Sequence, residues 1–214
     1  KGWDENKLDM FRRHIIQLGN SGVYVIYDEL EGKEAVTWSY LLHTVELPME
    51  MKELPNEVQV TGKNKAGGVS VAHLFSSAKT EQAIADTFFC APTNWKNVTN
   101  AQGKALKYPN HWHFSSTTVP CKVARFLTVM DTHGNNRPDM KVVRNGNTVQ
   151  VGDWVINCNL TEKGKAAITV TNKSEKVSLN YDAGKKEGAT IVTDQIKGKQ
   201  ISKVLTDYLP DFEI

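Results

Sequence analysis

Histidines offer the clearest chemistry in this sequence. His111 and His113 are two residues apart, so on a β-strand both imidazoles would project from the same face. Asp131 and His133 repeat this spacing on the next apolar run. Imidazole and carboxylate groups on one face can bind a metal ion, but zinc needs about four converging ligands. Each doublet supplies only two ligands, so the alternative is that both histidines simply face solvent while their neighbours fill the core.

A third histidine, His43, ends an alternating segment over residues 35–43. One face of this segment is apolar and is expected to face the core: it carries Val36, Trp38, Tyr40 and Leu42. His43 belongs to the opposite face, beside Leu41. That face is half apolar and half polar, which indicates that another layer or domain covers it. The alternative is an ordinary surface histidine at a strand end.

The elements that must position these histidines have a period of two. Apolar runs over residues 11–18 and 23–30 are separated by the sequence Gly-Asn-Ser-Gly, which is typical of a β-hairpin. Residues 76–108 form a longer irregular stretch marked by Pro and Asn. Long connections of this kind in β proteins tend to be functional or to pack against another part of the molecule.

A second hairpin is predicted from the runs over residues 111–115 and 122–130. Val119 and Pro120 lie between them and would form the turn. Such a hairpin would place residue 111 near residue 128. The two doublets that contain His113 and His133 would then lie toward the same end of one sheet.

Beyond a Gly- and Asn-rich linker at residues 134–139, short strands recur every eight to twelve residues. Only residues 196–209 have helical potential, and Gly198 weakens it. We therefore predict an all-β chain. Residues 1–137 are expected to form an antiparallel β-sandwich, and residues 138–214 a smaller β domain.

The composition narrows the function classes. The chain has 214 residues, of which 40% are hydrophobic and 23% charged, as in an ordinary globular protein. The net charge of +2 argues against a nucleic-acid-binding protein, and no apolar run is long enough to span a membrane. No phosphate-binding loop, nucleophile elbow or zinc-protease motif occurs. The odd number of cysteines fits one disulfide plus a thiol or, preferably, three buried thiols: Cys90, Cys121 and Cys158.

Several of these segments together resemble a known family. Four segments carry the resemblance: Phe11-Arg12-Arg13, the strand Val25-Ile26-Tyr27-Asp28-Glu29-Leu30, the strand Trp38-Ser39-Tyr40-Leu41-Leu42-His43-Thr44, and Pro48. Together they resemble the C-terminal β-sandwich of heparinase II/III-like polysaccharide lyases. The family pattern there is an Arg before a strand, a strand that ends in Asp, then a Trp-x-Leu-His strand and a Pro.

The resemblance extends over residues 8–133. Two further runs are similar to the next pair of family strands: His111-Trp112-His113-Phe114 and Phe126-Leu127-Thr128-Val129-Met130. Residues 138–214 resemble only loosely the small C-terminal β domain that some members carry.

The resemblance implies a larger protein than this chain. Family members place a helical toroid before the sandwich, bind the polysaccharide between the two, and cleave uronic-acid-containing glycosaminoglycan or alginate-like chains by β-elimination. A Tyr and a His transfer the protons, and these groups would precede Lys1. The chain begins without Met or a leader segment, so we expect a non-catalytic fragment of a periplasmic or secreted bacterial lyase. Its expected partners are an acidic polysaccharide and the toroid, and a homodimer is left open.

The resemblance also suggests site residues. In members with a structural zinc, the histidine that matches His43 is a ligand, and the other ligands would precede Lys1, so zinc would belong to the full-length parent. We assign His111, His113 and Trp95 as candidate substrate-binding residues. The competing hypothesis is a free-standing carbohydrate-binding or adhesion module, which would stack sugars on Trp95, Trp112 or Trp154.

Overall fold

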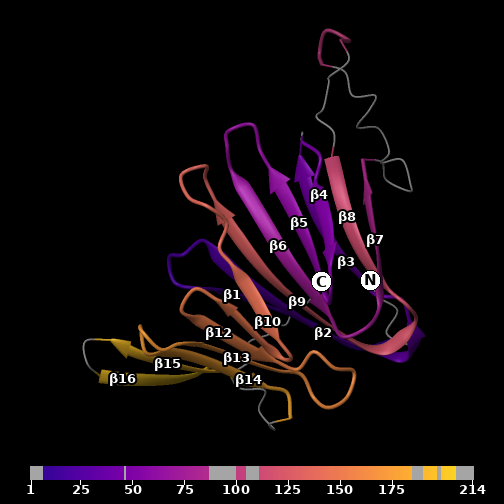
Figure 1. Ribbon diagram of the computed structural model, residues 1–214. Helices are drawn as coiled ribbons and strands as arrows, with labels where there is room; N and C mark the ends of the chain where they lie inside the picture. The colour runs from indigo at the N-terminus through magenta and orange to yellow at the C-terminus, as the bar shows by residue number, and fades with distance from the viewer. Residues whose placement is uncertain are drawn as a thin grey trace.

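The computed structural model describes residues 7–45, 47–86, 100–104, 111–184, 190–196 and 199–205. Within these ranges the chain forms antiparallel β-sheets and contains no helix, which confirms the predicted all-β class (Figure 1). No helix that could span a membrane occurs in the described part of the chain. The strands are β1 (Leu8–Gln17), β2 (Val23–Val36), β3 (Ser39–Val45), β4 (Glu50–Leu54), β5 (Glu57–Lys63), β6 (Val69–Ser76), β7 (Thr80–Ala85), β8 (His111–Thr118), β9 (Cys121–His133), β10 (Val142–Asn145), β11 (Thr148–Val151), β12 (Trp154–Cys158), β13 (Ala167–Asn172), β14 (Val177–Asp182), β15 (Thr190–Ile196) and β16 (Lys199–Leu205).

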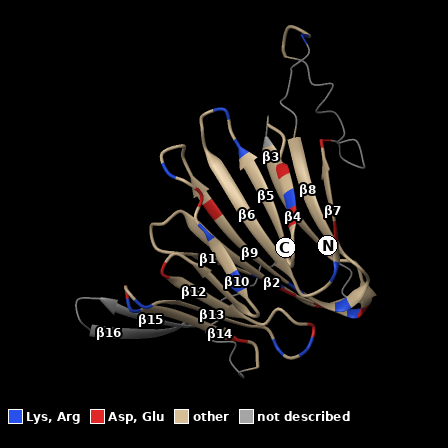
Figure 2. Cartoon of the chain, in the orientation of Figure 1, with Lys and Arg blue, Asp and Glu red and all other residues tan. Residues whose placement is uncertain are grey.

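Three sheets make up the described structure. A six-stranded central sheet has the order β1-β2-β9-β6-β5-β4, and a three-stranded sheet has the order β3-β8-β7. Strands β10 to β16 follow one another in a seven-stranded meander. One face of the central sheet packs against the three-stranded sheet, and the other packs against the meander, as the two hydrophobic clusters show. Basic and acidic residues are interspersed over these sheets (Figure 2).

Strands β2 and β9 lie at the centre of this arrangement because both of their faces are buried. On the meander side, Val25 of β2 and Leu127 of β9 join one hydrophobic cluster. On the opposite side, Leu30 and Phe126 join the other cluster. A strand that must supply apolar side chains to two faces cannot keep a simple polar and apolar alternation. This explains the long apolar runs in both segments.

The predicted hairpin between β1 and β2 is confirmed. The two strands pair antiparallel, and Leu18 and Val23 close the turn through a 2.9 Å backbone hydrogen bond. Gly22 has a φ of +77°, and a Cβ atom there would lie 2.4 Å from the carbonyl oxygen of Thr132. Glycine is therefore required at Gly22 both by the backbone conformation and by the close approach of β9.

The second predicted hairpin is wrong. Strand β8 pairs with β3 and β7 in the three-stranded sheet, whereas β9 lies between β2 and β6 in the central sheet. The chain thus crosses from one sheet to the other at Val119 and Pro120. The reason is that β9 is buried on both faces and fits only a central position, while β8 buries one face. His111 accordingly pairs with Val45 rather than near residue 128.

In the meander, the segment with helical potential is a strand as far as it is described. Strands β15 and β16 pair antiparallel, with Ile196 opposite Lys199. An isolated helix with such weak helical propensity would be only marginally stable. The strand pairing instead satisfies the backbone hydrogen-bonding groups of this segment. The chain passes from the central sheet to the meander between His133 and Val142. One hydrophobic cluster nevertheless contains residues from both sides of this connection. The domain boundary at residues 137 and 138 stays a prediction.

The described cysteines do not pair with each other. Cys121 is half-buried and Cys158 is buried, and both carry free thiols. Burial raises the pKa of the Cys158 thiol to about 12. Such a thiol packs as a small apolar side chain and is unreactive at neutral pH. Cys90 lies outside the described residues.

Trp38 provides a test of the core on the side of the three-stranded sheet. Its side chain is 6% exposed, and its indole nitrogen donates a hydrogen bond to the Cys121 carbonyl oxygen at 3.2 Å. We expect Trp38→Ala to lower the free energy of unfolding by about 3–5 kcal/mol because it leaves a large cavity. We expect His43→Ala, on the exposed face of the adjoining strand, to cost less than about 1 kcal/mol. Urea denaturation measures both. Equal losses would show that His43 belongs to the core.

Candidate functional site

The three-stranded sheet brings two of the predicted site residues together on its outer face. His43 of β3 and His113 of β8 are register partners, and their ring centroids are 6.0 Å apart. His43 is exposed and His113 is half-buried. The predicted orientation of β3 is confirmed, because Tyr40 on the opposite face is 2% exposed while Leu41 beside His43 is 49% exposed. We call this surface the histidine face.

His111 lies at the start of β8, exposed and near the same end of the sheet. The connection between β7 and β8 leaves from this end, since Ala85 of β7 pairs with His113. Trp95, the third residue predicted to bind substrate, lies in that connection outside the described residues. The histidine face therefore offers imidazole groups for hydrogen bonds to a polar ligand, next to an exposed apolar side chain, Leu41.

The histidine face alone does not complete a zinc site. Within the described residues no group of three or more His, Cys, Asp or Glu side chains converges as metal ligands would. His43 and His113 supply two imidazoles, whereas a structural zinc takes about four ligands. A zinc ion at His43 would need ligands from outside the described part of the chain.

The doublet of Asp131 and His133 has a structural role instead. Asp131 is fully buried and accepts hydrogen bonds from both terminal nitrogens of Arg137 and, at 2.7 Å, from the Met140 amide. His133 lies 2.9 Å from Asp139 through Nε2. These contacts hold the connection between β9 and β10 against the end of the central sheet.

Arg13, Asp28 and Tyr40 form a second polar contact, which joins segments that the sequence analysis considered separately. Arg13 donates hydrogen bonds from Nε and Nη2 to the two carboxylate oxygens of Asp28, at 2.7 and 2.8 Å. The guanidinium carbon lies 5.3 Å from the ring centre of Tyr40. Asp28 is buried, and its hydrogen bond raises the pKa of Arg13. This bidentate pair ties β1 to β2, with the exposed Arg13 beside Tyr40 at the three-stranded sheet.

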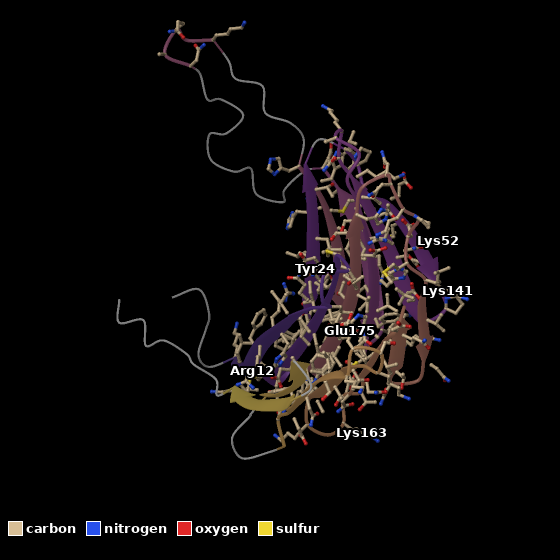
Figure 3. All side chains as sticks on the ribbon, turned by 90° about the vertical axis from the view of Figure 1, so that its left-hand side faces the viewer. Arg12, Tyr24, Lys52, Lys141, Lys163 and Glu175 are labelled. Atoms are coloured by element: carbon tan, nitrogen blue, oxygen red, sulfur yellow. The ribbon has the colours of Figure 1, made fainter. Side chains whose placement is uncertain are left out.

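A third cluster surrounds Glu29 on the side of the meander. Tyr181 of β14 donates to Oε1 of Glu29 at 2.6 Å, and Arg12 and His14 of β1 lie 3.1 and 3.2 Å from the same oxygen. Burial disfavours the Glu29 carboxylate, but these partners outweigh it and hold the pKa of Glu29 below its usual value. Burial and the bond to Glu29 raise the pKa of Tyr181 to about 12. Arg12, labelled in Figure 3, also donates a hydrogen bond from Nη1 to the Tyr181 hydroxyl.

Part of this cluster was accessible to sequence reasoning. Arg12 and His14 share one face of β1, and the hairpin places them beside Glu29 of β2. Tyr181 carries no such signal, because it lies 152 residues from Glu29 in the sequence.

Comparison with known proteins identifies no family. No protein-family model matches the chain, and no curated protein matches it significantly.

The contact between Arg13 and Asp28 can be tested by Arg13→Met, which keeps an unbranched side chain and removes the charge and the hydrogen-bond donors. We expect the free energy of unfolding to fall by about 2–3 kcal/mol, because buried Asp28 loses two charge-assisted hydrogen bonds. The matched control is Lys63→Met, which breaks the exposed ion pair with Glu50 and should cost less than about 1 kcal/mol. Urea denaturation compares the two variants, and equal costs would refute a special role for Arg13.

Asp131 predicts a defined pH dependence. Burial opposes its ionisation, but Arg137 and the Met140 amide more than compensate and lower the pKa of Asp131. Because the folded-state pKa lies below the unfolded value of about 4, the contribution to stability is complete above that pH and disappears as the pH falls through the folded-state value. Asp131→Asn should therefore lower Tm at pH 7, and the difference from wild type should shrink as the pH falls below the unfolded-state value of about 4.

The control for this experiment is Asp9→Asn on the exposed face of β1. It should leave Tm unchanged across the same pH range. A difference between wild type and Asp131→Asn that stays constant with pH would contradict the ionic origin of the effect.

Proposed function

We propose that this chain is the C-terminal, non-catalytic portion of a heparinase II/III-like polysaccharide lyase that degrades uronic-acid-containing polysaccharide by β-elimination. The observation that supports the proposal is the contact between Arg13, Asp28 and Tyr40. These residues come from three of the segments on which the resemblance to the family rests. Their packing gives a physical reason for an Arg, a strand ending in Asp and a Trp-to-His strand to occur together.

In this proposal the histidine face serves the neighbouring catalytic domain. It combines the imidazoles of His43 and His113 with exposed Leu41, which suits an interface that is partly apolar and partly polar. Imidazoles at such an interface can hydrogen-bond the hydroxyl or carboxylate groups of a bound acidic polysaccharide. The groups that transfer protons in β-elimination belong to the preceding helical toroid. This chain therefore supports the catalytic domain and orients the polysaccharide, and does not itself transfer a proton.

A structural zinc is part of the proposal only for the full-length parent. His43 would be the ligand from this chain, and the ion would tie its strand to the preceding ones, coupling metal binding to folding. Periplasmic or secreted localisation in a bacterium follows from the same proposal.

The competing function, a free-standing carbohydrate-binding module, requires aromatic side chains that share an open surface. Trp112 is half-buried and packs against the cluster of the three-stranded sheet, whereas Trp154 is half-buried against the meander cluster. These two lie on different parts of the molecule and form no common stacking platform. Trp95, the third candidate, lies outside the described residues.

Two observations test the proposal: the coding sequence upstream of Lys1 and the activity of the full-length parent protein. The coding sequence before Lys1 should continue for several hundred residues, rich in helix, with a Tyr and a His available for proton transfer. The purified parent should release unsaturated uronate from heparan sulfate, chondroitin sulfate or alginate, detected by its ultraviolet absorbance. The 214-residue chain alone should release none, because the proposal assigns the proton-transferring Tyr and His to the preceding toroid.

Two outcomes would overturn the proposal. A signal peptide directly before Lys1 would leave no room for a toroid and would favour the binding module. Unsaturated uronate formed by the 214-residue chain itself would show that the chain is catalytic. A catalytic-histidine variant of the parent is the control, since it should fold and lose all product.

A further inference from the structure

A polar cavity of about 480 Å³ lies at the end of the central sheet that faces away from the β5–β6 turn. Its walls come from the turn between β4 and β5, the connection between β6 and β7, and Arg144 at the end of β10. The volume is in the range of small-ligand sites. We call it the basal cavity. Its lining includes two cationic and two carboxylate side chains: Lys79, Arg144, Glu53 and Glu57.

Arg144 is held rigidly at the edge of this cavity. Its Nε donates to the Gly146 carbonyl oxygen at 2.8 Å, and its Nη1 donates to the Asn56 carbonyl oxygen at 3.1 Å. The guanidinium carbon lies 5.2 Å from the ring centre of Phe75. Asn56 has a φ of +63°, a left-handed conformation that Asn tolerates better than most residues. Nη2 of Arg144 donates to no described residue, so one edge of the fixed guanidinium remains able to bind an anion.

Glu57 is positioned by a buried histidine. His73, 6% exposed, lies with Nδ1 2.6 Å from Oε1 of Glu57. A carboxylate can only accept this hydrogen bond, so Nδ1 is the donor. The second oxygen of Glu57 has no hydrogen-bond partner among the described residues. This contact orients a carboxylate whose free oxygen can accept a hydrogen bond in the cavity.

Gln82 adds a neutral group of fixed orientation. Its amide nitrogen donates to Oγ1 of Thr80 at 2.7 Å and to Oγ of Ser116 at 3.4 Å. Its amide oxygen is therefore left as an acceptor. Lys79 and Glu53 also line the cavity, and neither side chain forms an ion pair or hydrogen bond with a described residue. Several polar groups are thus available to a ligand.

We propose that the basal cavity binds a uronic-acid-containing saccharide unit. A fixed guanidinium and a nearby ammonium match one carboxylate, while carboxylate and amide oxygens accept hydrogen bonds from sugar hydroxyls. The two cations and two carboxylates balance, so the site suits a unit with a single negative charge better than a polysulfated one. The choice of uronate among singly charged sugars rests on the proposed function.

The test is titration of the 214-residue chain with an unsulfated, glucuronate-containing tetrasaccharide by isothermal calorimetry. We expect saturable binding that is lost with the carboxyl-reduced tetrasaccharide. Lys79→Met and Glu53→Met should each weaken binding by about tenfold, because each removes a direct hydrogen bond to the ligand. Both positions are exposed and have no partner in the fold, so neither variant should change Tm.

Two controls locate the binding. Lys52→Met removes an exposed charge next to Glu53 in the chain, but Lys52 does not line the cavity and projects outward (Figure 3). Lys63→Met removes an exposed charge at the opposite end of β5 from the cavity. Both variants should bind like wild type. Absence of saturable binding, equal affinity for the carboxyl-reduced sugar, or equal weakening by Lys52→Met or Lys63→Met would overturn the proposal.

The result is separable from the test of the proposed function. If the parent cleaves uronic-acid polysaccharide but the chain does not bind the tetrasaccharide, only the basal cavity proposal fails. If the chain binds in the predicted way but is preceded by no toroid, the cavity proposal stands and the lyase proposal fails.

Discussion

The burial of β2 and β9 on both faces is the constraint on which the other elements depend. Their side chains must be covered on two sides, by the three-stranded sheet and by the meander. Hydrophobic burial of this extent is the main favourable term in folding. It also explains why the chain leaves one sheet for the other at Val119 and Pro120, since β9 must lie between β2 and β6 while β8 covers the sheet from outside.

Buried carboxylates then fix how the covering layers sit. Glu29 joins the β1–β2 hairpin to β14, and Asp131 holds the connection that leads into the meander. Asp28 holds Arg13 beside Tyr40 of the three-stranded sheet. Each carboxylate is buried and each has charged or hydrogen-bonding partners, which is the condition under which a buried charge can be tolerated. These contacts are directional, unlike apolar packing, and so specify a particular arrangement of the sheets.

The two candidate binding regions follow from this arrangement. The histidine face exists because β3 and β8 are neighbours and place His43 and His113 in register. The basal cavity exists because the β4–β5 turn and the end of β10 meet, and Arg144 bridges them. The first surface combines imidazoles with an apolar side chain and suits a protein interface, whereas the second is concave and polar and suits a small charged ligand.

The sequence by itself determined the all-β class, the β1–β2 hairpin and the faces of β3, because period-two patterning and turn residues are local signals. It also identified His43 and His113 as residues of interest, but not as neighbours. Only the tertiary structure decided that β8 and β9 belong to different sheets, that Tyr181 reaches Glu29, and that Arg144 closes a cavity. These contacts join segments far apart in the chain, and their pairing depends on how two-sided burial is satisfied by the whole molecule rather than on any local pattern.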